Sequence, residues 1–206
     1  MIQQVRETYG ARVGEYVEVC GTMDAADPHD RRLVADWASR TPGPILDVGC
    51  GPGQWTAYLH ERGASIAGVD PVAEFVQAAR RAYPGVEYRV GRAGALDCAP
   101  ASLGGALAWF SLIHTPPEEF DAVLADLASA VRSGGRLLVG YFEGPRLEAF
   151  DHKVCTAWYW PEAELVARLA QAGFACEATE ARTDPGARRV GAVSARRRDA
   201  AGDVAP

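Results

Sequence analysis

A buried strand that runs into a glycine-rich loop constrains this sequence most. Residues 44–53 read PILDVGCGPG, an apolar run with one acid followed by a glycine at every second position. The run predicts a buried strand, and the glycines predict a loop whose backbone approaches a ligand closely. A helical pattern follows, with Trp55, Tyr58 and Leu59 on one face and a stop at Gly63. The loop would then lie at a helix N-terminus, whose free N–H groups suit a nucleotide-type ligand.

Strands and helices alternate along the rest of the chain. Residues 65–69 predict a second buried strand that ends on Asp70, and Pro71 begins the next helix. We therefore predict an α/β fold of the Rossmann-like, doubly wound type. Its sheet has seven strands, mostly parallel with an antiparallel last strand, and helices on both faces. Ligands of such sheets bind at the carboxyl ends of the strands. The expected strands are 45–48, 65–69, 86–90, 104–110, 136–142, 174–180 and 188–195.

One domain is expected, because 206 residues with 48% hydrophobic and 23% charged side chains suffice for a single core. We predict that residues 1–196 form it. Residues 1–40 would be an N-terminal helical lid, and 143–160, which show no clear periodicity, an insertion on the substrate side. Residues 197–206 would be a disordered tail.

Composition disfavours several classes of partner. A net charge of −6 argues against nucleic acid, which proteins bind largely through clustered Lys and Arg. No run of about 18 apolar residues is present, so we expect no membrane span and a cytoplasmic location. We expect a monomer or homodimer that acts on a small-molecule substrate. The five cysteines form no Cys-x-x-Cys pair, so we predict neither disulfides nor a metal site.

The glycine loop and its acids narrow the choice of nucleotide. Gly49, Gly51 and Gly53 give Gly-x-Gly-x-Gly, one residue away from the Gly-x-Gly-x-x-Gly of dinucleotide sites. Asp47 before the loop would repel a phosphate but suits an ammonium group. Asp70 lies 17 residues after Gly53, close to where an acid takes ribose hydroxyls. A ligand with an amino-acid end is therefore favoured over NAD(P), although an NAD(P)-dependent oxidoreductase stays a less favoured alternative.

With Asp70 behind it, the stretch 45–53 resembles the S-adenosylmethionine site of class I methyltransferases. The resemblance continues through 130–139 and 172–174 and covers about residues 5–195. Within that family the chain is most similar to compact bacterial small-molecule methyltransferases, which place a Tyr-bearing N-terminal helix over the cofactor. The resemblance implies an enzyme that transfers a methyl group from S-adenosylmethionine to a small-molecule acceptor, whose acceptor atom (O, N, S or C) stays open.

The resemblance also implies roles for single residues. The three glycines would let the backbone approach the methionine part of the cofactor near Asp47, and Asp70 would take the ribose hydroxyls. Arg92 departs from the pattern, because many relatives carry there an acid that binds the adenine amino group. The implied cofactor-binding residues are Tyr16, Asp47, Gly49, Gly51, Gly53, Asp70, Pro71, Ala93, Gly94, Trp109 and Ser111.

His114 follows the fourth strand at the mouth of the expected site. Methyl transfer needs proximity and orientation, and a base only where the acceptor loses a proton of high pKa. His114 is our candidate for that base, with a structural role as the alternative. Tyr9, Phe142, His152 and Trp158 are the candidate substrate residues. Because fold and cofactor do not fix the chemistry, a cofactor-binding protein without methyl transfer stays the nearer alternative.

Overall fold

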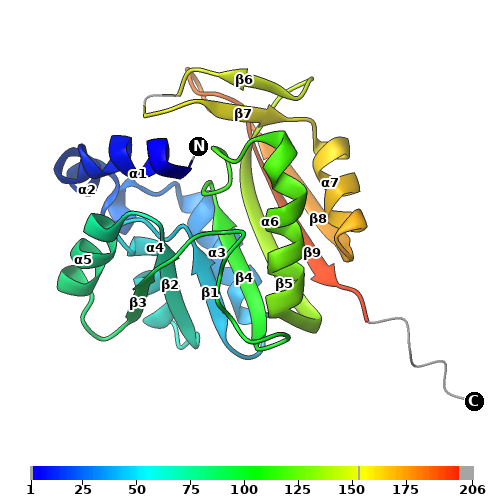
Figure 1. Cartoon of the computed structure of the whole chain (residues 1–206), viewed down its shortest axis with the longest axis horizontal. Coiled ribbons are helices and arrows are strands. Elements are labelled where there is room, and N and C mark those ends of the chain that lie inside the picture. The colour runs from blue at the N-terminus through cyan, green and yellow to red at the C-terminus, as the bar shows by residue number, and fades with distance from the viewer. Residues whose placement is uncertain (1, 153, 200–206) are drawn as a thin grey trace, which may run out of the picture.

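A nine-stranded sheet carries the fold (Figure 1) in the computed structural model, which describes residues 2–152 and 154–199. The strands are β1 (Ile45–Val48), β2 (Ile66–Asp70), β3 (Glu87–Val90), β4 (Leu103–Trp109), β5 (Val131–Glu143), β6 (Glu148–Phe150), β7 (Ala157–Trp160), β8 (Phe174–Arg182) and β9 (Val190–Arg197). The helices are α1 (Ile2–Gly10), α2 (Val13–Cys20), α3 (Pro28–Ser39), α4 (Gln54–His60), α5 (Ala73–Ala82), α6 (Pro117–Ala130) and α7 (Glu162–Gln171), with a short 3-10 helix at Met23–Ala25.

The order β3-β2-β1-β4-β5 forms the parallel body of the sheet, and β9 runs antiparallel between β5 and β8. This arrangement confirms the predicted Rossmann-like α/β fold. Successive residues of β1 face opposite sides: Ile45 packs in the cluster with α3 and α4, whereas Leu46 packs in the cluster with α6 and α7. Both faces are therefore covered by helices, which explains the near-continuous apolar strands.

The sheet has two strands more than the seven predicted, and both of them lie in the predicted insertion 143–160. Strand β7 pairs in parallel with the end of β5, where Phe142 lies opposite Tyr159, and β6 returns beside β7. Since β9 occupies the other edge of β5, β7 lies on the β4 side, past the last β4 pair at Trp109 and Gly140. The β6–β7 hairpin thus rises above the carboxyl edge of the sheet, at the top of Figure 1.

The N-terminal segment, predicted as a helical lid, begins with two helices, α1 and α2, which lie beside α5 at the same carboxyl edge (Figure 1). At the other end, β9 runs to Arg197, one residue past the predicted domain boundary. The prediction that 197 begins a tail is wrong at this residue, because its guanidinium donates to the carbonyls of Ala128 and Gly173. Residues 200–206 of the predicted tail lie outside the described residues.

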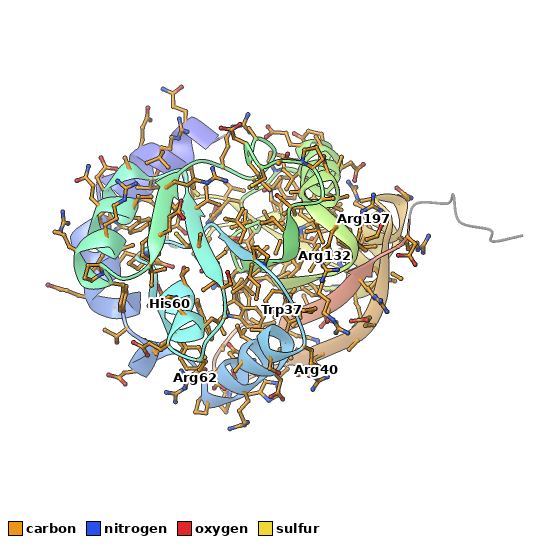
Figure 2. The ribbon with its side chains drawn as sticks, turned by 90° about the horizontal axis from the view of Figure 1, so that it is seen from below. Trp37, Arg40, His60, Arg62, Arg132 and Arg197 are labelled. Carbon is orange, nitrogen blue, oxygen red and sulfur yellow. The ribbon has the colours of Figure 1, made fainter. Side chains whose placement is uncertain are left out.

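The opposite edge of the sheet, seen from below in Figure 2, carries a set of basic side chains. Arg62 lies over the ring of Tyr58, 3.5 Å from its centroid, and Arg132 donates to the carbonyl of Pro42 at 3.0 Å. These contacts stabilise the turns near the amino ends of the strands. None of the described helices has the length and apolar character needed to cross a membrane.

Candidate functional site

A cavity of about 390 Å³ opens at the carboxyl ends of β1, β2 and β4. The glycine loop forms its floor, and residues of α1, α2 and α3 form the opposite wall. It brings together most of the predicted cofactor residues although they are far apart in sequence. Its lining includes the predicted residues Tyr9, Tyr16, Asp47, Gly49, Gly51, Asp70, Pro71, Trp109, Ser111 and His114.

The three glycines of the loop have different structural roles. All have positive φ, at +76° for Gly49, +54° for Gly51 and +88° for Gly53. A Cβ on Gly49 would lie 2.3 Å from Cβ of Ser111, and one on Gly53 would lie 2.8 Å from Cβ of Ala79. A Cβ on Gly51 would meet no atom within 4 Å. Gly49 and Gly53 therefore let the loop pack against the protein, and Gly51 keeps the cavity side open.

Asp70 ties the glycine loop to the beginning of α5. One carboxylate oxygen accepts the N–H of Gly51 and the other accepts the N–H of Val72, both at 2.8 Å. Burial raises the pKa of Asp70 to about 6, against the opposing effect of these two hydrogen bonds. The residue that joins the loop to α5 also lines the cavity.

Asp47 is the second buried acid of the site, with only 2% of its surface exposed. It accepts the hydroxyl of Thr56 at 2.7 Å, a partner that sequence reasoning missed. Burial, with a smaller contribution from the nearby charge of Asp70, raises the pKa of Asp47 to about 7. The Thr56 hydrogen bond acts in the opposite direction.

The cavity is electronegative. Among the described residues its lining contains Asp27, Asp30, Asp47 and Asp70 and neither lysine nor arginine. Asp30 pairs outside it with Arg182, whose Nη2 lies 3.1 Å from a carboxylate oxygen. Asp27 lies directly before α3 and Asp30 lies in its first turn, so this helix brings both acids to the cavity. Such a site favours a cation and disfavours a phosphate.

His114 is buried and hydrogen-bonded through both ring nitrogens. Its Nδ1 lies 2.8 Å from the carbonyl oxygen of Thr156, and its Nε2 lies 3.0 Å from the hydroxyl of Tyr9. Burial lowers the pKa of His114, and the hydrogen bond to Thr156 partly opposes that effect. The imidazole is therefore neutral near pH 7.

Aromatic rings surround this pair. The Tyr9 ring lies 5.5 Å from that of Tyr16 and 5.8 Å from that of Phe75, in edge-to-face geometry. Tyr16 contacts Phe75 as well, at 5.2 Å. Tyr9 and Tyr16 thus both pack the N-terminal helices against α5 and line the cavity.

Three predicted substrate residues lie outside the cavity lining. The His152 ring is 5.3 Å from that of His114, and Phe142 stands behind His152 at 5.8 Å. Trp158 packs against the main hydrophobic cluster, and its backbone N–H donates to Ile113. Phe142 also lies 5.6 Å from the ring of Phe110, which lines the cavity, so it stands one ring behind the cavity wall.

A second cavity, of about 90 Å³, adjoins the first between the β3 and β4 loops. Ala93 and Arg92 line it together with Pro71 and Ser111. Gly94 and Gly53 line neither cavity. Gly94 has φ +81°, and a Cβ there would lie 3.3 Å from Val123, so Gly94 shapes the loop instead of facing a ligand.

Phe110 and Gln54 complete the wall of the first cavity. Phe110 has φ +53°, an unusual conformation for a non-glycine residue, which turns the chain sharply after β4. The side-chain oxygen of Gln54 is buried with no partner among the described residues. The only sequence signal for Gln54 is its place directly after the last glycine of the loop.

Comparisons with known proteins agree with this geometry. Residues 45–135, from β1 to the beginning of β5, match the family described as "Methyltransferase domain". A crystal structure of 1,6-didemethyltoxoflavin-N1-methyltransferase from Burkholderia thailandensis, with bound 1,6-didemethyltoxoflavin and S-adenosylhomocysteine, has a TM-score of 0.78. It is 23% identical, over 96% of this chain and 88% of that chain. The [4+2]-cyclase SpnF has a TM-score of 0.80 at 18% identity, over 96% and 97% of the two chains.

Curated relatives match in sequence over part of their length. The trans-aconitate 2-methyltransferase of Azoarcus sp. (strain BH72) is 33% identical over 52% of this chain and 44% of its own. The malonyl-[acyl-carrier protein] O-methyltransferase of Pseudescherichia vulneris is 30% identical over 50% of this chain and 40% of its own. The matched region thus spans less than half of these relatives. Residues 45–135 therefore match a methyltransferase domain in sequence, and the chain shares the fold of the methyltransferase structure that it matches over 96% of its length.

Proposed function

We propose that this protein binds S-adenosylmethionine and transfers its methyl group to a small-molecule acceptor. The observation that carries the proposal is the cavity with a glycine-loop floor, four aspartates and neither lysine nor arginine among its described lining residues. A sulfonium and an ammonium group fit such a site, whereas the pyrophosphate of NAD(P) would face only acids. The match to a methyltransferase domain and the S-adenosylhomocysteine bound to the Burkholderia neighbour support the same cofactor.

Under this proposal, different residues would contact different parts of the cofactor. Asp47 and the backbone at Gly49 and Gly51 would hold the methionine part, and Asp70 would take the ribose hydroxyls. Pro71 and Ala93 in the second cavity would border the adenine, with Arg92 in place of the acid seen in many relatives. Tyr16, Trp109 and Ser111 would close the cofactor side of the cavity. When bound, the cofactor supplies a methyl group on a positively charged sulfur, which leaves as a neutral thioether.

Isothermal titration calorimetry tests the cofactor. We expect S-adenosylhomocysteine to bind with a Kd below 1 mM, and NAD and NADP not to bind at that concentration. Turnover is tested by incubating the protein with methyl-labelled S-adenosylmethionine and fractionated metabolite extracts. Labelled product together with S-adenosylhomocysteine is the expected result. If neither S-adenosylmethionine nor S-adenosylhomocysteine binds, the proposal is rejected.

A second candidate function keeps the cofactor but not the methyl transfer. The fold similarity to a protein named as a [4+2]-cyclase makes this alternative specific, since one fold hosts unrelated chemistry. Tight cofactor binding without S-adenosylhomocysteine formation across the extract fractions would favour it. The two candidates therefore give opposite results in the same turnover experiment.

His114 provides a prediction about catalysis. We propose that its neutral imidazole takes a proton from the acceptor, so His114→Ala should lower kcat about 100-fold or more while changing the Kd of S-adenosylhomocysteine less than threefold. Because the neutral form is the active one and burial lowers its pKa, wild-type kcat should rise with pH to a plateau, with a midpoint below 6.5. Equal kcat in variant and wild type at pH 7 would discard this role.

A further inference from the structure

We propose that the methyl acceptor is an uncharged phenol, and that the hydroxyl of Tyr9 holds the acceptor's place at His114 until the acceptor binds. This inference rests on the proposed function and names the substrate class for the same site. It depends on three observations. The hydrogen bonds of His114 show which ring nitrogen carries the proton, the phenol hydroxyl of Tyr9 already lies opposite the other ring nitrogen, and acids line the cavity.

The hydrogen bonds of His114 fix which nitrogen carries the proton. The carbonyl oxygen of Thr156 can only accept, so Nδ1, at 2.8 Å from it, is the N–H donor. The thiol sulfur of Cys155 lies 3.3 Å from the same Nδ1 and can also accept from it. In the neutral imidazole Nε2 then has a lone pair and no proton. A group opposite Nε2 must donate a hydrogen bond. A carboxylate or an ether cannot do so, whereas a hydroxyl can.

Tyr9 shows which kind of hydroxyl fits this position. Its phenol O–H donates to Nε2 at 3.0 Å, from a half-buried ring on α1. Edge contacts to Tyr16, Phe75 and His114 surround this ring. Aromatic pairs of this geometry recognise a flat ring rather than an aliphatic chain. An outward movement of Tyr9 would leave a ring-sized space that ends at the lone pair of Nε2.

The charge of the cavity favours a neutral acceptor. An anionic acceptor would meet Asp47 and Asp70 without a lysine or arginine among the described lining residues. A neutral phenol avoids this repulsion and becomes nucleophilic only when its proton leaves. The proton of the acceptor O–H bond passes to Nε2, and His114 becomes an imidazolium. The oxygen's electron pair forms the new O–C bond to the methyl group, and the C–S bond electrons return to the sulfur.

Tyr9→Phe separates this inference from a packing role, because it keeps the ring and removes the hydroxyl. The matched control is Tyr58→Phe on α4, whose hydroxyl donates to the carbonyl of Arg31 away from the cavity. Each protein is saturated with S-adenosylhomocysteine and labelled with ¹⁵N in its histidines. The His114 signals are assigned with a His114→Gln variant. The probes are phenol, anisole, which lacks the hydroxyl hydrogen, and benzoate, which is anionic.

In Tyr9→Phe the Nε2 signal of His114 should move toward that of an unbonded nitrogen, while Tyr58→Phe should match the wild type. Phenol should return the signal to its hydrogen-bonded position and bind about tenfold more tightly to Tyr9→Phe than to the wild type, because no hydroxyl competes. Anisole and benzoate should leave the signal unchanged. A signal that does not respond to phenol, or benzoate binding as tight as phenol binding, would overturn the inference.

The two proposals fail in different ways. If S-adenosylhomocysteine does not saturate the protein, the proposed function fails before any phenol is added. If S-adenosylhomocysteine binds and the Nε2 signal ignores phenol, only the substrate class fails.

Discussion

Alanine at position 49 is expected to lower the affinity for S-adenosylhomocysteine at least 100-fold and the Tm by about 4–8 °C. The residue has φ +76°, where a side chain costs about 1–2 kcal/mol. The added Cβ would also lie 2.3 Å from Cβ of Ser111. Ser111 cannot move away freely, because its hydroxyl donates to the carbonyl of Val48. The loop must therefore shift into the cavity, at a total cost of about 2 kcal/mol or more.

Gly63→Ala is the matched control for Gly49→Ala. Gly63 also has a positive φ, at +87°, but a Cβ there meets no atom within 4 Å, and the residue lies outside the cavity. Only the backbone cost should remain, so we expect a Tm decrease of about 2–4 °C and unchanged affinity. Scanning calorimetry and titration calorimetry measure both quantities. Wild-type affinity in Gly49→Ala would show that the loop does not support the cofactor site.

Asp70→Asn is expected to weaken binding of S-adenosylmethionine about 100-fold at pH 8. The amide oxygen can accept from one of Gly51 and Val72, but the amide N–H₂ group then faces the other N–H donor. The variant also loses the negative charge that suits a cationic ligand. A similar loss should occur in the wild type on acidification, because protonation of Asp70 removes the same charge.

The pH dependence of the affinity distinguishes the two buried acids. Burial raises the pKa of Asp70 to about 6 and that of Asp47 to about 7, so the binding-competent ionised forms exist above these values. Wild-type affinity should fall in two steps as the pH falls through 7 and then 6. Asp70→Asn should lose the step near 6 and keep a single step, moved to lower pH than in the wild type because the charge of Asp70 no longer raises the pKa of Asp47. Asp36→Asn, which removes an exposed acid of α3 outside the cavity, should leave affinity and both steps unchanged. A two-step profile retained in Asp70→Asn would contradict this assignment.

The cofactor side of the site could be predicted from sequence because its pattern is local. The strand, glycine loop and helix from Ile45 to His60 are contiguous, and the parallel order of β1, β2 and β4 brings Asp47, Asp70 and Ser111 to one edge. The conformations of Gly49 and Gly53 follow from the same stretch. Gly53 packs against Ala79 of α5 instead of facing the cavity. The distance between α5 and the glycine loop is set by tertiary packing, and no local sequence pattern predicts it.

The acceptor side could not be predicted in the same way, because long-range pairing determines it. Tyr9 and His114 are 105 positions apart, and their contact depends on where α1 lies over the sheet. Strands β6 and β7 are only three and four residues long, too short for a periodic signal, and their pairing with each other and with β5 fixes them. This pairing also decides the direction of the Phe142 and Trp158 side chains, for which residue type alone is no guide.

The acids around the cavity give its open end a negative electrostatic potential, because neither lysine nor arginine is among its described lining residues. Arg40, Arg62 and Arg132, labelled in Figure 2, lie at the opposite edge of the sheet. The negative potential attracts a cationic ligand toward the cavity before contact, so the association rate of such a ligand should fall with ionic strength. A reaction that removes the positive charge of the ligand ends this attraction. The neutral product can then leave the cavity without an electrostatic barrier.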